Sequence, residues 1–319
     1  MKKVLSVGLA VLCVLMLAPL SVLGKGETVA TAGNITNVPK AEEAVSETFI
    51  VCNTETGENT EMSAEDYIFG VVAAEMPALY DEEALKAQAV AAYTYACYRK
   101  AENSEKSYDI TNDHTTDQSY ISEAEARKRW GDNADTYAEK IKAAVKKTSG
   151  YMVTYEGKPA LTVYHAISSG KTEAAENVWG KEYPYLVAAD STGDKLSPDY
   201  ISVKTVSAEE LTSAFSGEAE VSGEPADYFK DISKTDSGTV KTISFCGKEL
   251  SGSKVRSLLD LRSTCFDVSF ADGNFTFTVY GYGHGVGMSQ YGADYMAKQG
   301  SNFKEILTCY YKGCKVEKV

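Results

Sequence analysis

An apolar helix that ends on a carboxylate is the sequence feature that most constrains how this chain can fold. Residues 67–75 carry no charge until the last of them, Glu75. Ser63 precedes the run and suits a helix N-cap. Pro77 disfavours helical backbone at the residue before it, which places Glu75 in the last turn. The sequence therefore predicts a buried helix over residues 64–75, around which other elements must pack.

The rest of the chain mixes helical and strand patterns without the regular alternation of a doubly wound sheet. We predict a second helix over about residues 81–100 and another over about 289–299. Residues 151–155 and 160–165 are typical of a hairpin, and 275–279 of a half-buried strand. The expected fold class is α+β, with mixed helices and antiparallel strands around a substrate groove.

The amino terminus is typical of a signal or a membrane anchor. Two lysines precede an apolar segment over residues 4–23, so residues 1–24 fit either an uncleaved transmembrane helix or a cleaved signal helix. If the lysines stay inside, the bulk of the chain faces outward. Residues 25–46 are predicted to be a flexible tether, and 47–319 the folded domain.

Charge and cysteine content narrow the choice of partners. The chain has 45 acidic and 32 basic residues, a formal net charge of -13, which argues against nucleic acid as a partner. Its seven cysteines are sparse and form no C-x-x-C pair, so we expect neither a disulfide framework nor a structural zinc site, but inert thiols or one incidental bridge.

Glu75 is the strongest candidate for chemistry. Burial and the negative end of the helix dipole both oppose ionisation of a carboxyl group there. A neutral carboxylic acid gives its proton to a leaving oxygen, which is what breaking a glycosidic bond requires. The alternative is an ordinary exposed glutamate at a helix end.

Several sequence blocks together resemble one known family, the stage II sporulation protein D family. The resemblance spans roughly residues 49–319 in the family's order. The blocks are Gly-Val-Val-Ala-Ala-Glu-Met-Pro-Ala at 70–78 with residues 83–92, Ser-Ser-Gly-Lys-Thr-Glu at 168–173 with Glu-Asn-Val-Trp-Gly at 176–180, Tyr-Pro-Tyr-Leu at 183–186, and Gly-Tyr-Gly-His-Gly-Val-Gly-Met-Ser-Gln-Tyr-Gly at 281–292.

The resemblance implies a membrane-anchored peptidoglycan lytic transglycosylase without a cofactor, which acts in engulfment during endospore formation. Its substrate would be denuded glycan strands, which have lost their stem peptides. The implied partners are the amidase/endopeptidase stage II sporulation protein P and the membrane protein stage II sporulation protein M. The implied location is the cell membrane, with the catalytic domain between mother cell and forespore. Relatives of this domain also enhance amidases without cutting, which is the alternative function.

The resemblance also implies catalytic roles. Glu75 matches the family acid, which first protonates the bond between N-acetylmuramic acid and N-acetylglucosamine and then acts as a base. Lys86 would orient the acid or contact the glycan, or else lie on a solvated helix face. Tyr185 would contact a sugar or stabilise positive charge, or else pack in the core. Glu173 and Glu176 remain conceivable as a second carboxylate of the kind that hydrolases use.

Predicted substrate contacts come from the other blocks. The expected groove-lining residues are Ser168, Ser169, Thr172, His284 and Gln290, with a buried structural role as the alternative for His284. Tyr93 stands where the family usually has arginine, and it supplies a hydrogen bond without a permanent charge.

We expect no bound metal. Some family members hold zinc in the loop that corresponds to residues 110–120, but this segment contains no cysteine. His114, beside Asp113 and Asp117, is better explained as part of a surface loop.

Overall fold

The computed structural model describes residues 47–113 and 115–319. The predicted anchor at 1–24, the predicted tether at 25–46 and His114 lie outside the described residues. Of the helices in the described ranges, none combines the length and the apolar character that crossing a bilayer requires.

Two consecutive helices, α1 (Ala64–Glu75) and α2 (Glu82–Glu102), contribute most to the larger hydrophobic core. Both begin at side-chain caps: the hydroxyl of Ser63 and the carboxylate of Asp81 each accept a backbone N–H from the first turn. Helix α1 ends at Glu75 because the next residue is extended ahead of Pro77. The predicted positions of both helices are confirmed to within about two residues.

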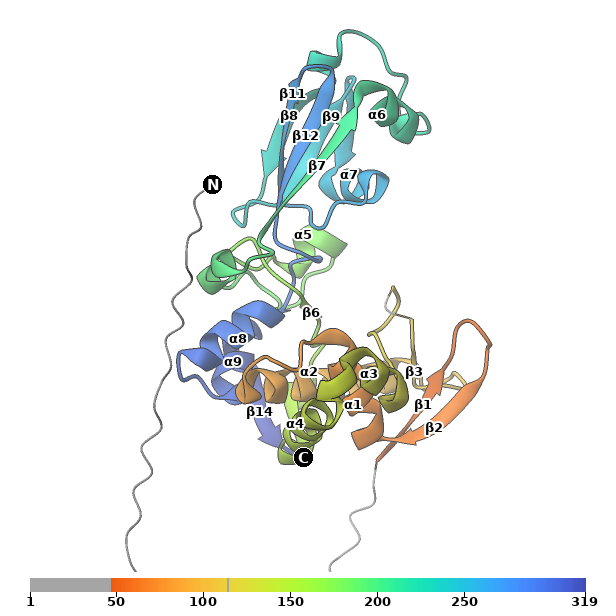
Figure 1. Ribbon diagram of the computed structural model, residues 1–319, viewed down its shortest axis with the longest axis vertical. Coiled ribbons are helices and arrows are strands. Elements are labelled where there is room, and N and C mark those ends of the chain that lie inside the picture. Colours follow the sequence, from red (N-terminus) through yellow and green to blue (C-terminus); the bar gives the residue numbers. More distant parts are fainter. Residues whose placement is uncertain (1–46, 114) are drawn as a thin grey trace, which may run out of the picture. The chain divides into compact units, whose positions relative to one another are not determined.

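Helix α2 lies at the centre of this core and contacts α1, α4, α8, α9 and β4 (Figure 1). Its fully buried alanines, among them Ala87 and Ala91, allow neighbouring backbones to approach closely. The other helical elements are α3 (Glu123–Trp130), η1 (Gly131–Asn133), α4 (Ala134–Lys147), α5 (Ala175–Trp179), η2 (Thr192–Leu196), α8 (Gln290–Lys298) and α9 (Phe303–Tyr310).

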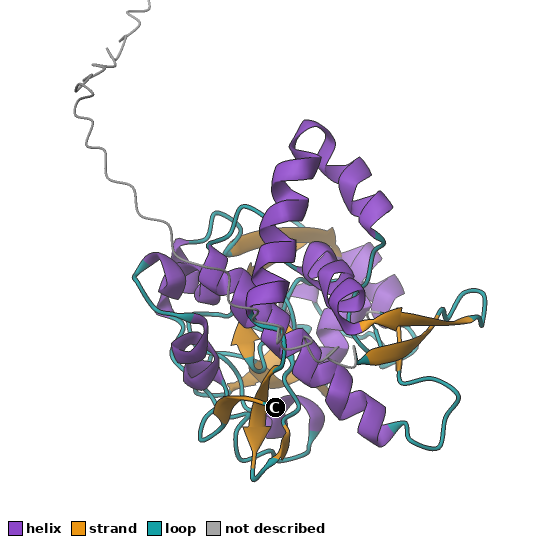
Figure 2. Cartoon of the chain, turned by 90° about the horizontal axis from the view of Figure 1, so that it is seen from below, coloured by secondary structure: helices purple, strands orange, loops and turns teal. Residues whose placement is uncertain are grey.

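Short strands accompany these helices as separate pieces rather than as one sheet (Figure 2). They are β1 (Thr48–Cys52), β2 (Asn59–Ser63), β3 (Ile110–Thr111), β4 (Tyr151–Tyr155), β5 (Lys158–Pro159), β6 (Tyr164–His165), β13 (Met288–Ser289) and β14 (Lys315–Lys318). Pairing is antiparallel between β1 and β2, β4 and β5, and β4 and β14, as expected. Two short pairs, β1 with β3 and β6 with β13, are parallel, which the sequence did not predict.

The hairpin predicted at 151–155 and 160–165 is wrong in its second strand. Only β5 returns along β4, and the chain then turns onto α2, where the hydroxyl of Thr162 donates to the carbonyl oxygen of Ala91 at 2.7 Å. Contacts with α2 therefore replace the continuation of the hairpin.

Residues 201–280 form an inserted module with a hydrophobic core of its own, rich in buried phenylalanine. Its elements are β7 (Ile201–Ser207), α6 (Ala208–Phe215), η3 (Pro225–Asp227), β8 (Phe229–Lys234), β9 (Val240–Phe245), β10 (Lys248–Ser251), α7 (Gly252–Leu259), β11 (Phe266–Ala271) and β12 (Asn274–Tyr280). The sheets have the orders β10-β9-β8 and β11-β12-β7, and Figure 1 shows β7 beside β12. The strand predicted at 275–279 is confirmed as part of β12.

The module is inserted as a loop whose two ends meet. The backbone N–H of Gly281 donates to the carbonyl oxygen of Tyr200 at 2.8 Å, so the chain leaves and returns at one place. A turn of the module also docks on the main body: the Ser169 hydroxyl donates to the Ser237 carbonyl at 2.6 Å, and the Ser237 hydroxyl to the Thr172 carbonyl at 2.8 Å. Ser169 and Thr172 therefore hold the module in place.

We expect Phe277→Ala to lower the free energy of unfolding by roughly 3–5 kcal/mol, because this ring is fully buried between Phe229 and Phe266. Thr276→Ala is the control, since Thr276 lies on the opposite face of β12. Denaturant unfolding followed by circular dichroism measures both, and equal losses would contradict a separate core in the module.

Candidate active site

Glu75 lies at the end of α1 with its carboxylate held from two directions. Oε1 accepts the backbone N–H of Ser119 at 2.8 Å, and Oε2 lies 3.4 Å from Nε2 of Gln290. The residue is part-buried rather than bathed in solvent. The structure thus brings together the last turn of α1, the loop after β3 and the start of α8, which are far apart in sequence.

Two more glutamines lie one step away from this carboxylate: Gln88 contacts Gln290, and Gln118 precedes Ser119 in the chain. The side chain of Gln88 is fully buried on α2, with its Oε1 3.5 Å from Nε2 of Gln290. Oε1 of Gln118 accepts a hydrogen bond from the Tyr164 hydroxyl at 2.7 Å, and Nε2 of Gln118 donates to the Tyr67 hydroxyl at 3.1 Å. Amide groups orient hydrogen bonds without adding charge beside the carboxylate.

The tyrosines of this cluster are neutral hydrogen-bonding groups. Burial, together with the nearby charge of Glu75, raises the pKa of Tyr164 well above its usual value. Burial likewise raises the pKa of Tyr67. Both phenols therefore keep their protons at any physiological pH.

Gly70 allows the loop that carries Ser119 to reach α1. A Cβ atom at Gly70 would lie 2.3 Å from Cε2 of Tyr120 and 2.6 Å from the carbonyl oxygen of Ile121, both far inside van der Waals contact. The N–H of Ile121 also donates to the carbonyl of Gly70 at 3.3 Å. Only glycine therefore fits at this point of the helix.

Buried Asp194 connects the predicted Ser168 block to the start of α8. One of its oxygens accepts the backbone N–H and the hydroxyl of Ser168, and the other accepts the Ser289 hydroxyl at 2.8 Å. Burial raises the pKa of Asp194, and these hydrogen bonds partly offset that effect. Ser168 thus positions the segment that delivers Gln290 to Glu75.

His284 lies in the Gly-rich loop between two other rings, with its centroid 5.7 Å from that of His165 and 5.3 Å from that of Trp179. Its Nδ1 accepts the backbone N–H of Val286 at 3.1 Å, and it also hydrogen-bonds with the backbone of Tyr164. Burial lowers the pKa of His284 to about 4 and that of His165 to about 3. Both imidazoles are therefore neutral at pH 7.

The structure does not bring Lys86 to Glu75. The Lys86 amine pairs with Glu82 at 2.8 Å and Glu83 at 2.7 Å. Burial lowers the pKa of Lys86, but the bonds to these two carboxylates outweigh it and the net shift is upward. These two ion pairs give the Lys86 amine partners within the protein, without a contact to a glycan.

Tyr185 and Tyr93 also have structural partners. The Tyr185 side chain is buried, and its hydroxyl accepts the backbone N–H of Leu161 at 2.9 Å while its ring packs against Tyr155. The Tyr93 hydroxyl donates to Glu47 at the start of the described chain. Neither has a contact with Glu75 in the described structure.

Neither Glu173 nor Glu176 shares a side-chain hydrogen-bonding partner with Glu75 among the described residues. Glu173 is buried, and its oxygens accept hydrogen bonds from the backbone N–H of Ala174, the Asn177 amide and the Thr235 hydroxyl. Glu176 is exposed on α5. Glu173 thus helps to hold the module, in the same way as Ser169.

Within residues 47–113 and 115–319, no cluster of three potential metal ligands occurs. Asp117 is committed to other groups: it pairs with Arg99 at 2.7 Å and accepts both the N–H and the hydroxyl of Thr111. The described cysteines are all free, and burial raises the pKa of Cys97 to about 12, so its thiol is not activated.

Four residues in or near this site were not predicted from the sequence: Gln88, Ser119, Tyr164 and Asp194. A polar side chain among alanines on a buried helix face was the available signal for Gln88. Ser119 acts through its backbone N–H, which any residue other than proline supplies. Tyr164 and Asp194 carry no local signal, because their partners come from distant segments.

The chain is similar to several known proteins. A family model described as "Stage II sporulation protein" matches residues 53–155, which include Glu75 and Ser119. The chain is 38% identical over 255 residues to stage II sporulation protein D of Bacillus amyloliquefaciens, covering 79% of this chain and 73% of that protein. The protein of the same name from Bacillus subtilis (strain 168) is also 38% identical over 255 residues, covering 79% and 74%.

A further relative is the amidase enhancer of Bacillus subtilis (strain 168), 28% identical over 295 residues, which cover 76% of this chain and 39% of that protein. The chain belongs to the stage II sporulation protein D family and is related to this amidase enhancer.

We expect Gly70→Ala to destabilise the chain by roughly 1–3 kcal/mol, because the new methyl group must displace Tyr120 and Ile121. The matched control is Gly217→Ala, where nothing lies within 4 Å of the new Cβ. Thermal unfolding compares the two variants. Equal melting temperatures would contradict the close approach of the loop to α1.

The two histidines predict a loss of stability in acid. Their pKa values are about 3 and 4 in the folded chain and about 6.5 when unfolded, so the unfolded state binds more protons between pH 6.5 and 4. The free energy of unfolding should therefore decrease as the pH is lowered across this window, by up to about 1.4 kcal/mol per pH unit for each histidine. Urea unfolding at several pH values measures this slope.

The control is His284→Asn, whose amide oxygen can still accept the N–H of Val286. In this variant the free energy of unfolding should depend less steeply on pH, by the amount that corresponds to about one proton. An unchanged slope would mean that His284 does not titrate in this window.

Proposed function

We propose that the chain is a peptidoglycan lytic transglycosylase that cleaves the bond between N-acetylmuramic acid and N-acetylglucosamine in glycan strands without stem peptides. The observation that carries the proposal is the placement of Glu75: part-buried, hydrogen-bonded by the Ser119 N–H and faced by the Gln290 amide. Membership of the stage II sporulation protein D family and the relation to an amidase enhancer support a cell-wall substrate.

The reaction needs one carboxyl group in two protonation states. As an acid, Glu75 gives its proton to the glycosidic oxygen, and the bond from that oxygen to C1 of the muramoyl ring breaks. As a carboxylate, it then takes the proton from the C6 hydroxyl while O6 bonds to C1, which closes a 1,6-anhydro ring. Glu75 ends protonated, as it began, with the proton of the C6 hydroxyl in place of the one it gave away, and no water is consumed.

The neighbours of Glu75 suit the intermediate stage. The Ser119 N–H and the Gln290 amide donate to the carboxylate that exists between the two proton transfers. Gln88 contacts the Gln290 amide, and the neutral phenol of Tyr164 donates to Gln118, so the groups next to these two donors bring no competing charge. The carboxylate thus remains free to accept the C6 proton.

Within the described residues the side-chain contacts of Glu75 are with Ser119 and Gln290 and not with a second carboxylate, which suits a transglycosylase that works with one acid. Hydrolases with two carboxylates hold them roughly 5–9.5 Å apart, one as acid and one as nucleophile or base. In the described structure Glu173 is committed to its own donors, and Glu176 is exposed on α5.

In this proposal His284 and Gln290 remain substrate-facing residues. Ser168, Ser169 and Thr172 act by positioning the segments around the groove. The ion pairs of Lys86, the buried hydroxyl of Tyr185 and the contact of Tyr93 with Glu47 give those three residues structural roles.

The biological setting is part of the proposal. We place the chain at the cell membrane during engulfment, anchored through residues 1–24, with its folded part between mother cell and forespore. An amidase such as stage II sporulation protein P would supply denuded strands, and stage II sporulation protein M would be a membrane partner.

A second candidate function is a wall-binding activator of an amidase, which the 28% identity to the amidase enhancer favours. Such a protein binds the glycan or the amidase without cutting. Wild-type chain would then release no sugar products, yet a separately purified amidase would cut faster in its presence.

We expect Glu75→Gln to lower the rate of release of 1,6-anhydro ends from denuded strands by roughly 10²- to 10⁴-fold, because glutamine cannot transfer a proton. Mass spectrometry of the soluble products measures this. The control is Glu176→Gln, an identical change at an exposed carboxylate, which should retain wild-type release.

Full cutting by Glu75→Gln would place the acid elsewhere. Reducing ends in place of anhydro ends would indicate a hydrolase, and intact strands with wild-type chain would favour the activator. A thermal melt of Glu75→Gln close to that of wild type separates loss of chemistry from loss of folding.

A further inference from the structure

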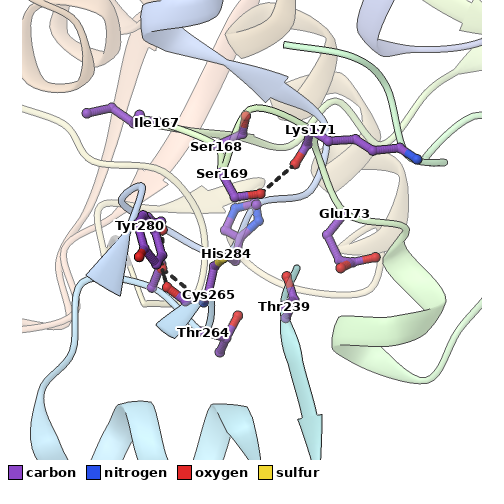
Figure 3. A pocket seen from close by; sticks show the side chains of 13 residues that line it. Ile167, Ser168, Ser169, Lys171, Glu173, Thr239, Thr264, Cys265, Tyr280 and His284 are labelled. Carbon is purple, nitrogen blue, oxygen red and sulfur yellow. Dashed lines mark hydrogen bonds between the residues drawn. The ribbon is translucent and has the colours of Figure 1, made fainter. Parts of the chain in front are cut away.

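An aspartate with a buried side chain is connected to each of the two groups that contact the Glu75 carboxylate. For one of them it is Asp194, whose partner Ser168 lies at the junction with the inserted module (Figure 3). The cavity at that junction is about 20 Å³, room for about one water molecule, so side chains almost fill it. For the other group, the backbone N–H of Ser119, the aspartate is Asp117.

The Asp117 carboxylate contacts both β3 and α2, and its side chain has no exposed surface. Oδ2 accepts the N–H and the hydroxyl of Thr111 at 2.9 and 2.8 Å, and Oδ1 lies 2.7 Å from Nε of Arg99 and 3.3 Å from the Tyr95 hydroxyl. Arg99 acts through its charge, because its Nε makes no hydrogen bond within the described residues. A buried carboxylate is costly without such partners, so together they fix the position of Asp117.

The next two residues along the chain depend on the position of Asp117. The side chain of Gln118 lies between two tyrosine hydroxyls, and the backbone N–H of Ser119 donates to Glu75 at 2.8 Å. Adjacent Cα atoms are only about 3.8 Å apart, so a shift of Asp117 passes to both residues. Lengthening the bond to Glu75 by about 1 Å would take it beyond hydrogen-bonding range.

Other contacts of this loop leave Asp117 as the attachment on its N-terminal side. Thr115 and Thr116 are exposed, and their hydroxyls hydrogen-bond to Asp113 within the same turn. On the C-terminal side, the N–H of Ile121 donates to the carbonyl of Gly70 on α1. The position of the intervening backbone is thus set by Asp117 at one end and by Ile121 at the other.

We infer that Asp117 and Arg99 are positioning residues of the candidate active site, and that their ion pair holds the Ser119 amide against the Glu75 carboxylate. The inference rests on the proposed function, in which that amide stabilises the carboxylate formed when Glu75 gives up its proton. The buried side chain of Asp117 cannot reach a glycan strand. Its loss should therefore slow the chemical step and leave binding of the strand unchanged.

The Ser119 amide can be observed directly, because Gln118–Ser119 is the one Gln-Ser step in the sequence. With the glutamine carbonyl carbon and the serine nitrogen isotopically labelled, a triple-resonance NMR spectrum of the full chain contains a single amide signal, that of Ser119. Asp117→Asn keeps an acceptor oxygen but removes the charge that faces Arg99. We expect it to move the amide proton signal upfield, because the hydrogen bond to Glu75 lengthens. Glu75→Gln calibrates the direction, since an amide oxygen is a weaker acceptor than a carboxylate.

Asp117→Asn should also lower the rate of release of anhydro ends from denuded strands by roughly 10- to 100-fold, with the apparent KM for the strands unchanged within about threefold. Arg99→Met should lower the rate in the same way. Arg99→Lys, which keeps the positive charge, should recover most of it. A thermal melt of each variant separates loss of positioning from loss of folding. If Asp117→Asn does not fold, Arg99→Met carries the same comparison, because the Arg99 side chain is partly exposed.

The matched control is Asp109→Asn, the same change in the segment that leads into β3. The Asp109 carboxylate also accepts a backbone N–H, that of Ile50 at 2.9 Å, and faces Lys100 at 3.5 Å. Within the described residues it bonds to neither Gln118 nor Ser119. This variant should keep both the wild-type rate of release and the wild-type Ser119 signal.

An unmoved Ser119 signal in Asp117→Asn would overturn the inference, and so would a signal that moves while release stays at the wild-type rate. A raised KM with an unchanged kcat would also overturn it, because Asp117 would then act on strand binding. If wild-type chain releases no anhydro ends, the proposed chemistry fails by itself. A Ser119 signal that moves in Asp117→Asn but not in Asp109→Asn would still support the placement of the amide by the ion pair.

Discussion

The hydrogen bond from the Ser119 backbone N–H to the Glu75 carboxylate is the contact on which the candidate site depends. It joins the end of α1 to a loop 44 residues later, and the missing side chain of Gly70 allows the approach. Once the loop is seated, Gln118 comes between the hydroxyls of Tyr67 and Tyr164, and the amide of Gln290 closes the other side. One backbone contact thus orders several side chains around a single acid.

Buried polar groups also help to fix the segments around Glu75. Asp194 has almost no exposure, and its burial would cost stability without its hydrogen-bond donors. The Asp194 carboxylate accepts hydrogen bonds from two segments that meet only in the folded chain, one at Ser168 and one at Ser289. Such a network fixes one arrangement of these segments in advance, which is what the proposed proton transfer requires.

Contacts with the inserted module give several motif residues a structural role. In the sequence Ser169 and Thr172 look like substrate contacts, and Glu173 like a conceivable second carboxylate. In the structure each also makes one hydrogen bond to the turn of the module around Thr235 and Ser237. These residues therefore take part in the docking of the module, which has its own core, on the main body. A recognisable sequence block can thus hold two parts of the fold together as readily as it can bind a substrate.

The sequence by itself determined the local elements: the cap at Ser63, the stop at Pro77 and the alternation in β12 depend on near neighbours, so α1, the ending at Glu75 and that strand were predictable. Only the tertiary structure decided which polar groups meet at Glu75, since Gln290 lies 215 residues away along the chain. It also decided that Lys86 and Tyr185 have other partners, and that residues 201–280 bury a core of their own. Caps and periodicity are short-range effects, whereas these contacts depend on packing between segments that no local pattern relates.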